Sequence, residues 1–126
     1  MNILDSSAWL EVLVDGPQAA TFLSLIESGK LLVPAVTIFE VTKRARVMGN
    51  QADADRIESH MRRFSVIDLT AERASSAAKC SFEFKLPMAD SMIYAAVLEF
   101  KATLWTLDDD FEGLAQVRYF PHSRGT

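Results

Sequence analysis

The sequence predicts an α/β protein of three layers, α/β/α, with helices on both faces of a central, mostly parallel sheet of about four to five strands. Short apolar runs alternate with longer segments of helical periodicity. Strands separated by helices are typical of parallel sheets with right-handed crossovers, which are buried on both faces. The chain has 126 residues, the length of one domain, 1–126. The predicted strands are residues 2–4, 31–33, 65–69, 102–107 and 117–120.

The predicted helices lie between these strands and have recognisable ends. They span about residues 7–14, 17–28, 37–48, 52–64, 70–84 and 87–100. Asp15-Gly16-Pro17 and Gly49-Asn50 are turn signals, and Thr70 fits a helix N-cap. The last helix is apolar nearly all round, so we expect it to be buried. Residues 121–126 are expected to form a frayed tail. In the helix at 70–84, small residues are expected to face inward: Ala74, Ala77, Ala78 and Ser81.

The composition excludes several classes of protein. The chain is 49% hydrophobic and 24% charged, which is typical of a globular protein and not of a disordered one. No apolar run approaches the roughly 20 residues needed to span a bilayer, so no membrane association is expected. A strand that begins at residue 2 leaves no room for a signal peptide. The single cysteine, Cys80, is expected to be a small apolar helix residue, and a cytoplasmic location is expected because no internal disulfide can form.

Basic residues gather in one part of a chain whose net charge is -4. Residues 43–63 carry six basic residues against three acidic ones. A solvated helix face is the commoner meaning of such a cluster, and the alternative is a surface for the phosphates of RNA, whose binding would weaken with salt. The six candidates are Lys43, Arg44, Arg46, Arg56, Arg62 and Arg63.

Four acidic residues stand where strands end or helices begin. Asp5 and Asp108 directly follow predicted strands, and Glu40 follows the strand at 31–33 closely. Asp90 is the exception in an otherwise apolar helix. Because the carboxyl ends of parallel strands form the binding crevice of open α/β sheets, these side chains are expected to converge there.

Each of these acids also has a structural interpretation. Asp5 could be a helix N-cap. Glu40 could form a capping box with Thr37, or pair with Arg44 one turn later. Asp90 would suit the dipole of its helix. Asp108 and Asp110 could be turn residues.

Carboxylates that share a crevice repel one another unless a cation neutralises them. Hard oxygen ligands without a cluster of Cys or His favour Mg²⁺ or Mn²⁺ over zinc. The absence of a well-placed histidine argues against a Ser-His-Asp site built on Ser6 or Ser7.

Four segments together resemble the PIN domain, and most closely the VapC-type toxins of bacterial toxin–antitoxin systems. They occur in the order of that family, and the resemblance covers nearly the whole chain. The segments are Leu4-Asp5-Ser6-Ser7, Thr37-Ile38-Phe39-Glu40-Val41, Leu86-Pro87-Met88-Ala89-Asp90 and Leu104-Trp105-Thr106-Leu107-Asp108-Asp109-Asp110-Phe111.

The resemblance implies a PIN-like domain that is a Mg²⁺- or Mn²⁺-dependent endoribonuclease and acts as a toxin. Metal-activated water would hydrolyse RNA phosphodiester bonds, with Glu40 a possible proton acceptor. Ser6 and Thr106 match hydroxyl positions that support the site. Which of the three consecutive aspartates reaches the metal is left open. The implied catalytic residues are Asp5, Glu40, Asp90 and Asp108, and the implied metal ligands are Asp5, Asp90 and Asp108, with Glu40 and Asp110 as further candidates.

The resemblance also implies partners, namely an RNA substrate, a second copy in a homodimer, and an antitoxin that covers the site. Trp9, Leu10 and Leu13 could line the groove for the antitoxin or belong to the core.

Three other interpretations place different requirements on the sequence. A PIN-like module that has lost catalysis and only binds RNA or protein is one alternative, and the full set of acids argues against it. A phosphotransfer receiver domain would need an aspartate at a mid-chain strand end, whereas Asp53 and Asp55 lie in a helical pattern. A haloacid-dehalogenase-type phosphatase would need Asp-x-Asp at the start, where Ser7 stands instead.

Overall fold

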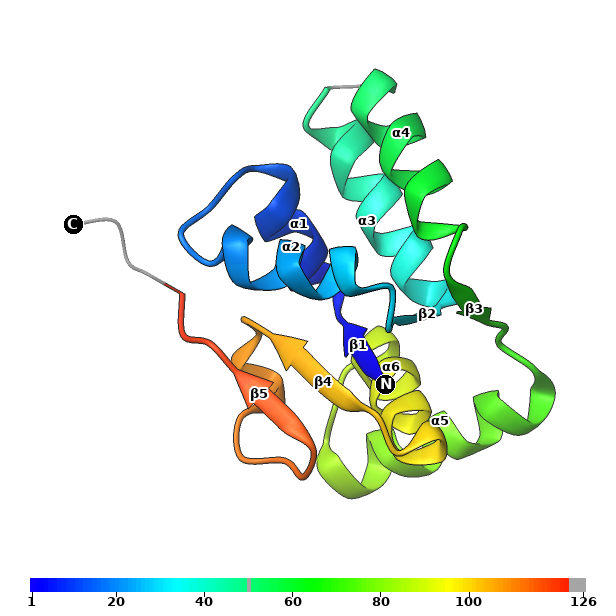
Figure 1. The fold of residues 1–126 in the computed structure, drawn as a ribbon. Helices are drawn as coiled ribbons and strands as arrows, with labels where there is room; N and C mark the ends of the chain where they lie inside the picture. The colour runs from blue at the N-terminus through cyan, green and yellow to red at the C-terminus, as the bar shows by residue number, and fades with distance from the viewer. Residues whose placement is uncertain (50, 123–126) are drawn as a thin grey trace.

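The computed structural model describes residues 1–49 and 51–122, in which strands and helices alternate (Figure 1). The strands are β1 (Asn2–Leu4), β2 (Leu32–Pro34), β3 (Ser65–Ile67), β4 (Thr103–Thr106) and β5 (Val117–Tyr119). The helices are α1 (Ser6–Leu13), α2 (Ala19–Ser28), α3 (Ala35–Val47), α4 (Gln51–Met61), α5 (Ala71–Phe84), α6 (Met88–Phe100) and the 3₁₀ helix η1 (Asp109–Phe111).

The strand pairings are all parallel, as the alternation of strands and helices predicts. β1 pairs with β4 and β4 with β5, while β2 pairs with β3. The two sections meet where Asn2 forms a parallel bridge with Leu31 and its amide donates to the carbonyl of Lys30 at 3.1 Å. The strands therefore lie in the order β3-β2-β1-β4-β5, and their carboxyl ends share one edge.

Successive strand residues point to opposite faces of the sheet, and this alternation builds a core on each face. Ile3 and Leu104 pack in the cluster that contains the buried residues of α5 and α6. Leu4 and Trp105, their neighbours in the chain, pack with residues of α1 to α4. Figure 1 shows these two groups of helices at opposite ends of the view, with strands between them. The three-layer prediction is thus confirmed, as is the burial of α6, where Ser91 and residues 93–97 are covered.

Two local predictions are wrong. The third helix begins at Ala35 rather than near Thr37, because the backbone of Pro34 already adopts the extended conformation of an N-cap. Thr37 is therefore a fully buried residue inside the helix and forms no capping box with Glu40. In α5 the inward prediction is confirmed for Ala77, which is buried, but it is wrong for Ala74 and Ala78, which are exposed because the helix turns Ala77 and Cys80 toward the core.

Two further expectations concern the ends and surface of the chain. Residues 123–126 of the predicted tail lie outside the described residues. Within residues 1–49 and 51–122, none of the helices has the length and apolar character needed to cross a membrane.

Candidate metal centre

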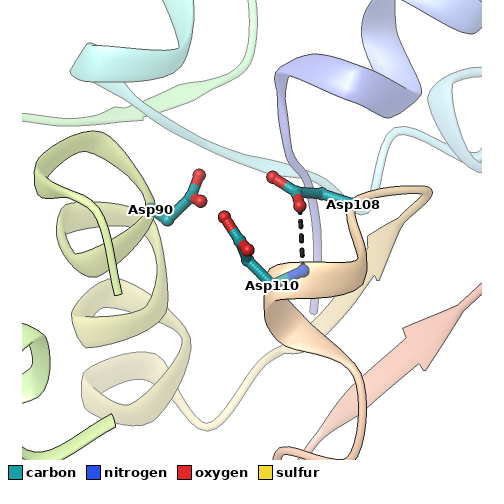
Figure 2. Close-up of side chains that lie close together, drawn as sticks. All are labelled: Asp90, Asp108 and Asp110. Atoms are coloured by element: carbon teal, nitrogen blue, oxygen red, sulfur yellow. Dashed lines mark hydrogen bonds between the residues drawn. The ribbon is translucent and has the colours of Figure 1, made fainter. Parts of the chain in front are cut away.

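Three aspartates converge at the carboxyl edge of the sheet. Asp90 lies in the first turn of α6, and Asp108 and Asp110 belong to the turn that follows β4. Carboxylate oxygens from these three residues lie within 4.8 Å of one another (Figure 2). Residues 18 or more positions apart are thus brought together by the fold, at the edge where the sequence places them.

The turn after β4 decides which of the consecutive aspartates face Asp90. Asp108 is the N-cap of η1, and its Oδ1 accepts a hydrogen bond from the amide of Asp110 at 2.9 Å (Figure 2). This bond fixes the Asp108 carboxylate over the turn, and the Asp110 carboxylate lies on the same side, toward Asp90 (Figure 2). Asp109, between them, is exposed and does not belong to the group.

Asp5 lies deeper in the protein and is only 1% exposed. It is the N-cap of α1, and its Oδ1 accepts hydrogen bonds from the Ala8 amide at 3.1 Å and the Ser7 hydroxyl at 2.6 Å. Its Oδ2 accepts from the Thr106 hydroxyl at 2.6 Å. The capping interpretation of Asp5 is therefore correct, and it is compatible with a place beside the other acids.

The two hydroxyls that bind Asp5 also hold the loop that carries Asp108. Thr106 Oγ1 accepts a hydrogen bond from the Asp108 amide at 2.9 Å, and Ser7 Oγ accepts from the Leu107 amide at 3.0 Å. Each hydroxyl thus donates to the carboxylate and accepts from the loop backbone. Asp5 positions Asp108 through these contacts, across about 100 residues of sequence.

Ser7 is a residue that sequence reasoning missed, because Ser6 was the predicted support. In the structure the Ser6 hydroxyl lowers the pKa of Glu40, so Ser6 acts on another acid of the site and Ser7 on Asp5. The signal for Ser7 was a hydroxyl two residues after an N-cap aspartate, within the same turn. Thr106, the other predicted support, is fully buried and makes the contacts described above.

Glu40 enters the site from α3. Its Oε1 is buried without a hydrogen-bond partner among the described residues. Burial raises its pKa, the Ser6 hydrogen bond lowers it, and the charge of Asp108 raises it further. The alternative pair with Arg44 does not form: within the described part of the chain, the four ion pairs leave out both residues.

The electrostatics of the site are those of crowded carboxylates without basic partners. Burial raises the pKa of Asp90 to about 8, and the charge of Asp108 contributes in the same direction. Burial likewise raises the pKa of Asp5 to about 6, against the lowering effect of its hydrogen bonds. None of the ion pairs in residues 1–49 and 51–122 includes a member of this group. A set of hard oxygen donors that lacks a neutralising side chain fits Mg²⁺ or Mn²⁺.

Half of the basic residues predicted to bind RNA already have acidic partners. Arg46 pairs with Asp55 at 2.8 Å. Two pairs lie within or next to α4, where Arg56 contacts Asp53 at 3.2 Å and Arg62 contacts Glu58 at 3.4 Å. These pairs are exposed, so each is a weak interaction that a phosphate could replace. The acids nevertheless reduce the positive potential that the sequence alone indicated.

Trp9 and its neighbours belong largely to the core. Trp9 is 2% exposed and packs in the cluster under α1 to α4, whereas Leu10 and Leu13 are half-buried. Trp9 and Leu13 also line a groove of about 490 Å³ between α1, α2 and α4, together with Ile57 and His60.

The parallel sheet and its acidic edge define an α/β domain with a candidate site for a divalent cation. The chain belongs to the PIN domain family, whose model matches residues 3–117. That membership agrees with the ordered acidic motifs of the sequence, and it removes the receiver and phosphatase interpretations.

Solved structures share the fold at low sequence identity. A toxin–antitoxin complex from Klebsiella pneumoniae matches with a TM-score of 0.78 and 19% identity, over 97% of this chain and 100% of that chain. VapC20 of Mycobacterium tuberculosis, described as a sarcin-ricin loop cleaving toxin, matches with a TM-score of 0.74 and 16% identity, over 94% and 99%. FitAcB of Neisseria gonorrhoeae has a TM-score of 0.70 and 19% identity, over 95% and 96%. Comparison with curated protein sequences found no match.

Replacing Thr106 by valine should destabilise the fold. The change keeps the shape of the side chain but leaves Asp5 Oδ2 and the Asp108 amide without their partner, at a cost of about 1–3 kcal/mol in the free energy of unfolding. Urea denaturation measures this cost. Thr103→Val, at the other end of β4, is the matched control and should have little effect, and an equal loss in both variants would refute the role given to the hydroxyl.

The metal-free protein should lose stability as the pH rises from about 4 to about 8. The folded-state pKa of Asp90 is raised from 3.8 to about 8, so the folded protein retains a proton that the unfolded chain has released. This stabilisation is complete below pH 4 and is lost as the pH passes 8. Asp5 contributes between 3.8 and about 6. Urea denaturation with chelator at several pH values measures the slope, which Asp90→Asn should flatten; equal slopes would contradict the assignment.

Proposed function

We propose that this protein is a Mg²⁺- or Mn²⁺-dependent endoribonuclease that hydrolyses RNA phosphodiester bonds and acts as the toxin of a toxin–antitoxin pair. The observation that carries the proposal is the convergence of the carboxylates of Asp90, Asp108 and Asp110 within 4.8 Å. They lie in a chain of the PIN domain family, beside Asp5 and Glu40. Repulsion between so many carboxylates destabilises the folded state unless a bound cation neutralises their charge.

The structural neighbours support the toxin part of the proposal. One is described as a toxin that cleaves the sarcin-ricin loop, and another is a toxin–antitoxin complex. Their sequence identity to this chain is below 20%, so they support the fold, and the RNA substrate must be identified by experiment.

The mechanism assigns different tasks to the acids. A bound Mg²⁺ or Mn²⁺ would lower the pKa of a water and stabilise charge on the phosphate. Asp90, Asp108 and Asp110 would hold the ion, and Asp5 would orient Asp108 through the hydroxyls of Ser7 and Thr106. Glu40 can accept the proton of the attacking water at its unpaired Oε1.

The RNA backbone is proposed to cross α3, where the basic residues lie nearest to the site in sequence. Arg44 is exposed one turn after Glu40 and is left out of the ion pairs of the described residues. Arg62 and Arg63 precede β3, at the end of that strand opposite to its carboxyl edge. Arg44 is therefore the stronger candidate for a phosphate contact.

Two protein partners complete the proposal. The groove beside Trp9 and Leu13 offers apolar surface that an antitoxin segment could fill. A homodimer is proposed because large apolar side chains remain uncovered on the helices that carry the site, with Phe39 62% exposed on α3 and Met88 73% exposed on α6.

Purified protein, free of any antitoxin, should cut bacterial RNA at discrete positions with Mg²⁺ or Mn²⁺ and not with chelator. Asp90→Asn keeps the shape and removes a ligand charge, so cleavage should fall at least about 100-fold, as expected when metal-dependent transition-state stabilisation is lost. Sequencing of the new 5′ ends identifies the cuts.

The matched control for that experiment is Asp15→Asn. Asp15 is an exposed acid in the turn after α1 with φ of 53°, a conformation that asparagine also tolerates. The Asp15→Asn variant should cleave RNA at the same positions and rate as the unmodified protein. Absence of both cleavage and metal binding, by calorimetry, would return the acids to their capping roles and refute the nuclease.

Arg44→Gln should weaken RNA binding and make it less sensitive to salt. Each phosphate contact releases a condensed counterion, so loss of one contact should lower the slope of log K against log salt concentration by about 0.7 for a single strand. Fluorescence anisotropy with a labelled single-stranded RNA and the metal-free protein measures the slope. Lys30→Gln, an exposed basic residue before β2 and at the opposite edge of the sheet, is the control, and equal slopes for all three proteins would exclude Arg44 from the path.

A further inference from the structure

A second cavity, separate from the groove beside Trp9 and Leu13, adjoins the acidic cluster of Asp90, Asp108 and Asp110. It has Asp108 in common with that cluster. The cavity has a volume of about 430 Å³ and lies between the turn after β4 and the end of β5. Asp108 lines it, and so does Asp109, the aspartate that does not face Asp90. Tyr119, Pro121 and His122 form the other wall. The cavity therefore begins at a residue of the candidate metal centre and continues toward two ring side chains.

We propose that this cavity binds one nucleobase of the RNA substrate, next to the phosphate that is cleaved, and that the preferred base is guanine. The inference rests on the proposed ribonuclease function and deepens it by naming a specificity site. Asp109, Tyr119 and His122 are its specificity-determining residues.

The size and lining of the cavity fit a single base. Ligand pockets in proteins are about 300–1,000 Å³, so 430 Å³ is near the lower end, where a small planar group is held. Proteins that read single-stranded RNA splay bases out and stack them on aromatic or histidine rings. Tyr119 and His122 provide such rings within three positions of one another.

The sheet fixes the position of the Tyr119 backbone relative to the site, and its side chain lines the cavity. In the parallel register Tyr119 is the partner of Thr106, the residue that binds Asp5. The amide of Phe120 donates to the carbonyl of Thr106 at 2.8 Å and holds the end of β5 against β4. A base on this wall would thus lie one strand away from the cluster of carboxylates, within reach of a nucleotide whose phosphate is bound there.

Asp109 provides the reason for a preference among bases. An ionised carboxylate only accepts hydrogen bonds, and it accepts two in parallel from adjacent N–H groups. Guanine presents two such donors side by side on its pairing edge, whereas the other bases do not. The Ser7 hydroxyl, also at the cavity, is already used by Asp5 and the Leu107 amide. The exposed carboxylate of Asp109 is therefore the group suited to selecting the base.

The test is cleavage of an RNA pool with a randomised single-stranded stretch, by the full-length protein with Mg²⁺, followed by sequencing of the new ends. The unmodified protein should prefer guanine about tenfold at one position beside the cut. Asp109→Asn should abolish that preference and keep metal-dependent cleavage. Tyr119→Leu should raise KM about tenfold, the effect of one lost base stack, with little change in kcat. Glu112→Gln, an exposed acid just beyond η1, is the matched control and should change neither quantity.

A second measurement does not depend on turnover. Titration with guanosine 5′-monophosphate and Mg²⁺ should shift the NMR signals of the Tyr119 and His122 rings, and Asp109→Asn should weaken that binding about tenfold.

The outcomes separate the two proposals. Cleavage with the same base profile in Asp109→Asn and Tyr119→Leu as in the unmodified protein would overturn the base site and leave the nuclease intact. Absence of cleavage by the unmodified protein would instead count against the nuclease. The base site would then be judged by the nucleotide titration, where unshifted ring signals would overturn it as well.

Discussion

The site depends on the hydrogen bonds that satisfy the buried carboxylate of Asp5. A charged group that is 1% exposed is tolerated only when its oxygens are satisfied, and here three donors satisfy them. One donor is the backbone of α1, which Asp5 caps. The Thr106 hydroxyl lies at the end of β4, and the Ser7 hydroxyl binds the same loop. The requirement to satisfy one acid therefore fixes the start of the first helix against the loop that carries Asp108.

The other acids oppose this stabilisation. Asp90, Asp108 and Asp110 gather their charges where no basic side chain of the described residues neutralises them. The metal-free fold responds by retaining a proton, which is the physical meaning of the raised pKa of Asp90. An arrangement that serves stability alone would place an arginine here, as Arg73 stands against Glu99 on the α5–α6 side. Departures from local stability of this kind mark functional sites.

The sequence predicted what local patterns encode. Strands followed directly by acids placed Asp5 and Asp108 at one sheet edge, and the near-continuous apolar character of α6 predicted its burial. It did not reveal contacts between distant residues, such as the bond from Thr106 to Asp5 across 101 positions. Ser7 was missed although it lies two residues from Asp5, because Ser6 matched the expected supporting position and the bond from the Leu107 amide to Ser7 joins distant residues. The start of α3 was misplaced because the capping pattern at Thr37 competes with Pro34, and tertiary packing decides between them.

The three consecutive aspartates show how one turn can serve two sites. The N-cap bond from the Asp110 amide fixes the Asp108 carboxylate. The carboxylates of Asp108 and Asp110 lie toward Asp90, whereas Asp109 is exposed beside the second cavity. A single run of like residues thus divides its carboxylates between a cation and the proposed base. Because Thr106 and Ser7 hold this loop to Asp5, the positions of Asp108 and Asp109 both depend on Asp5. The geometry that would position the phosphate would also position the base beside it, so selection of the base and chemistry at the phosphate would depend on the same buried carboxylate.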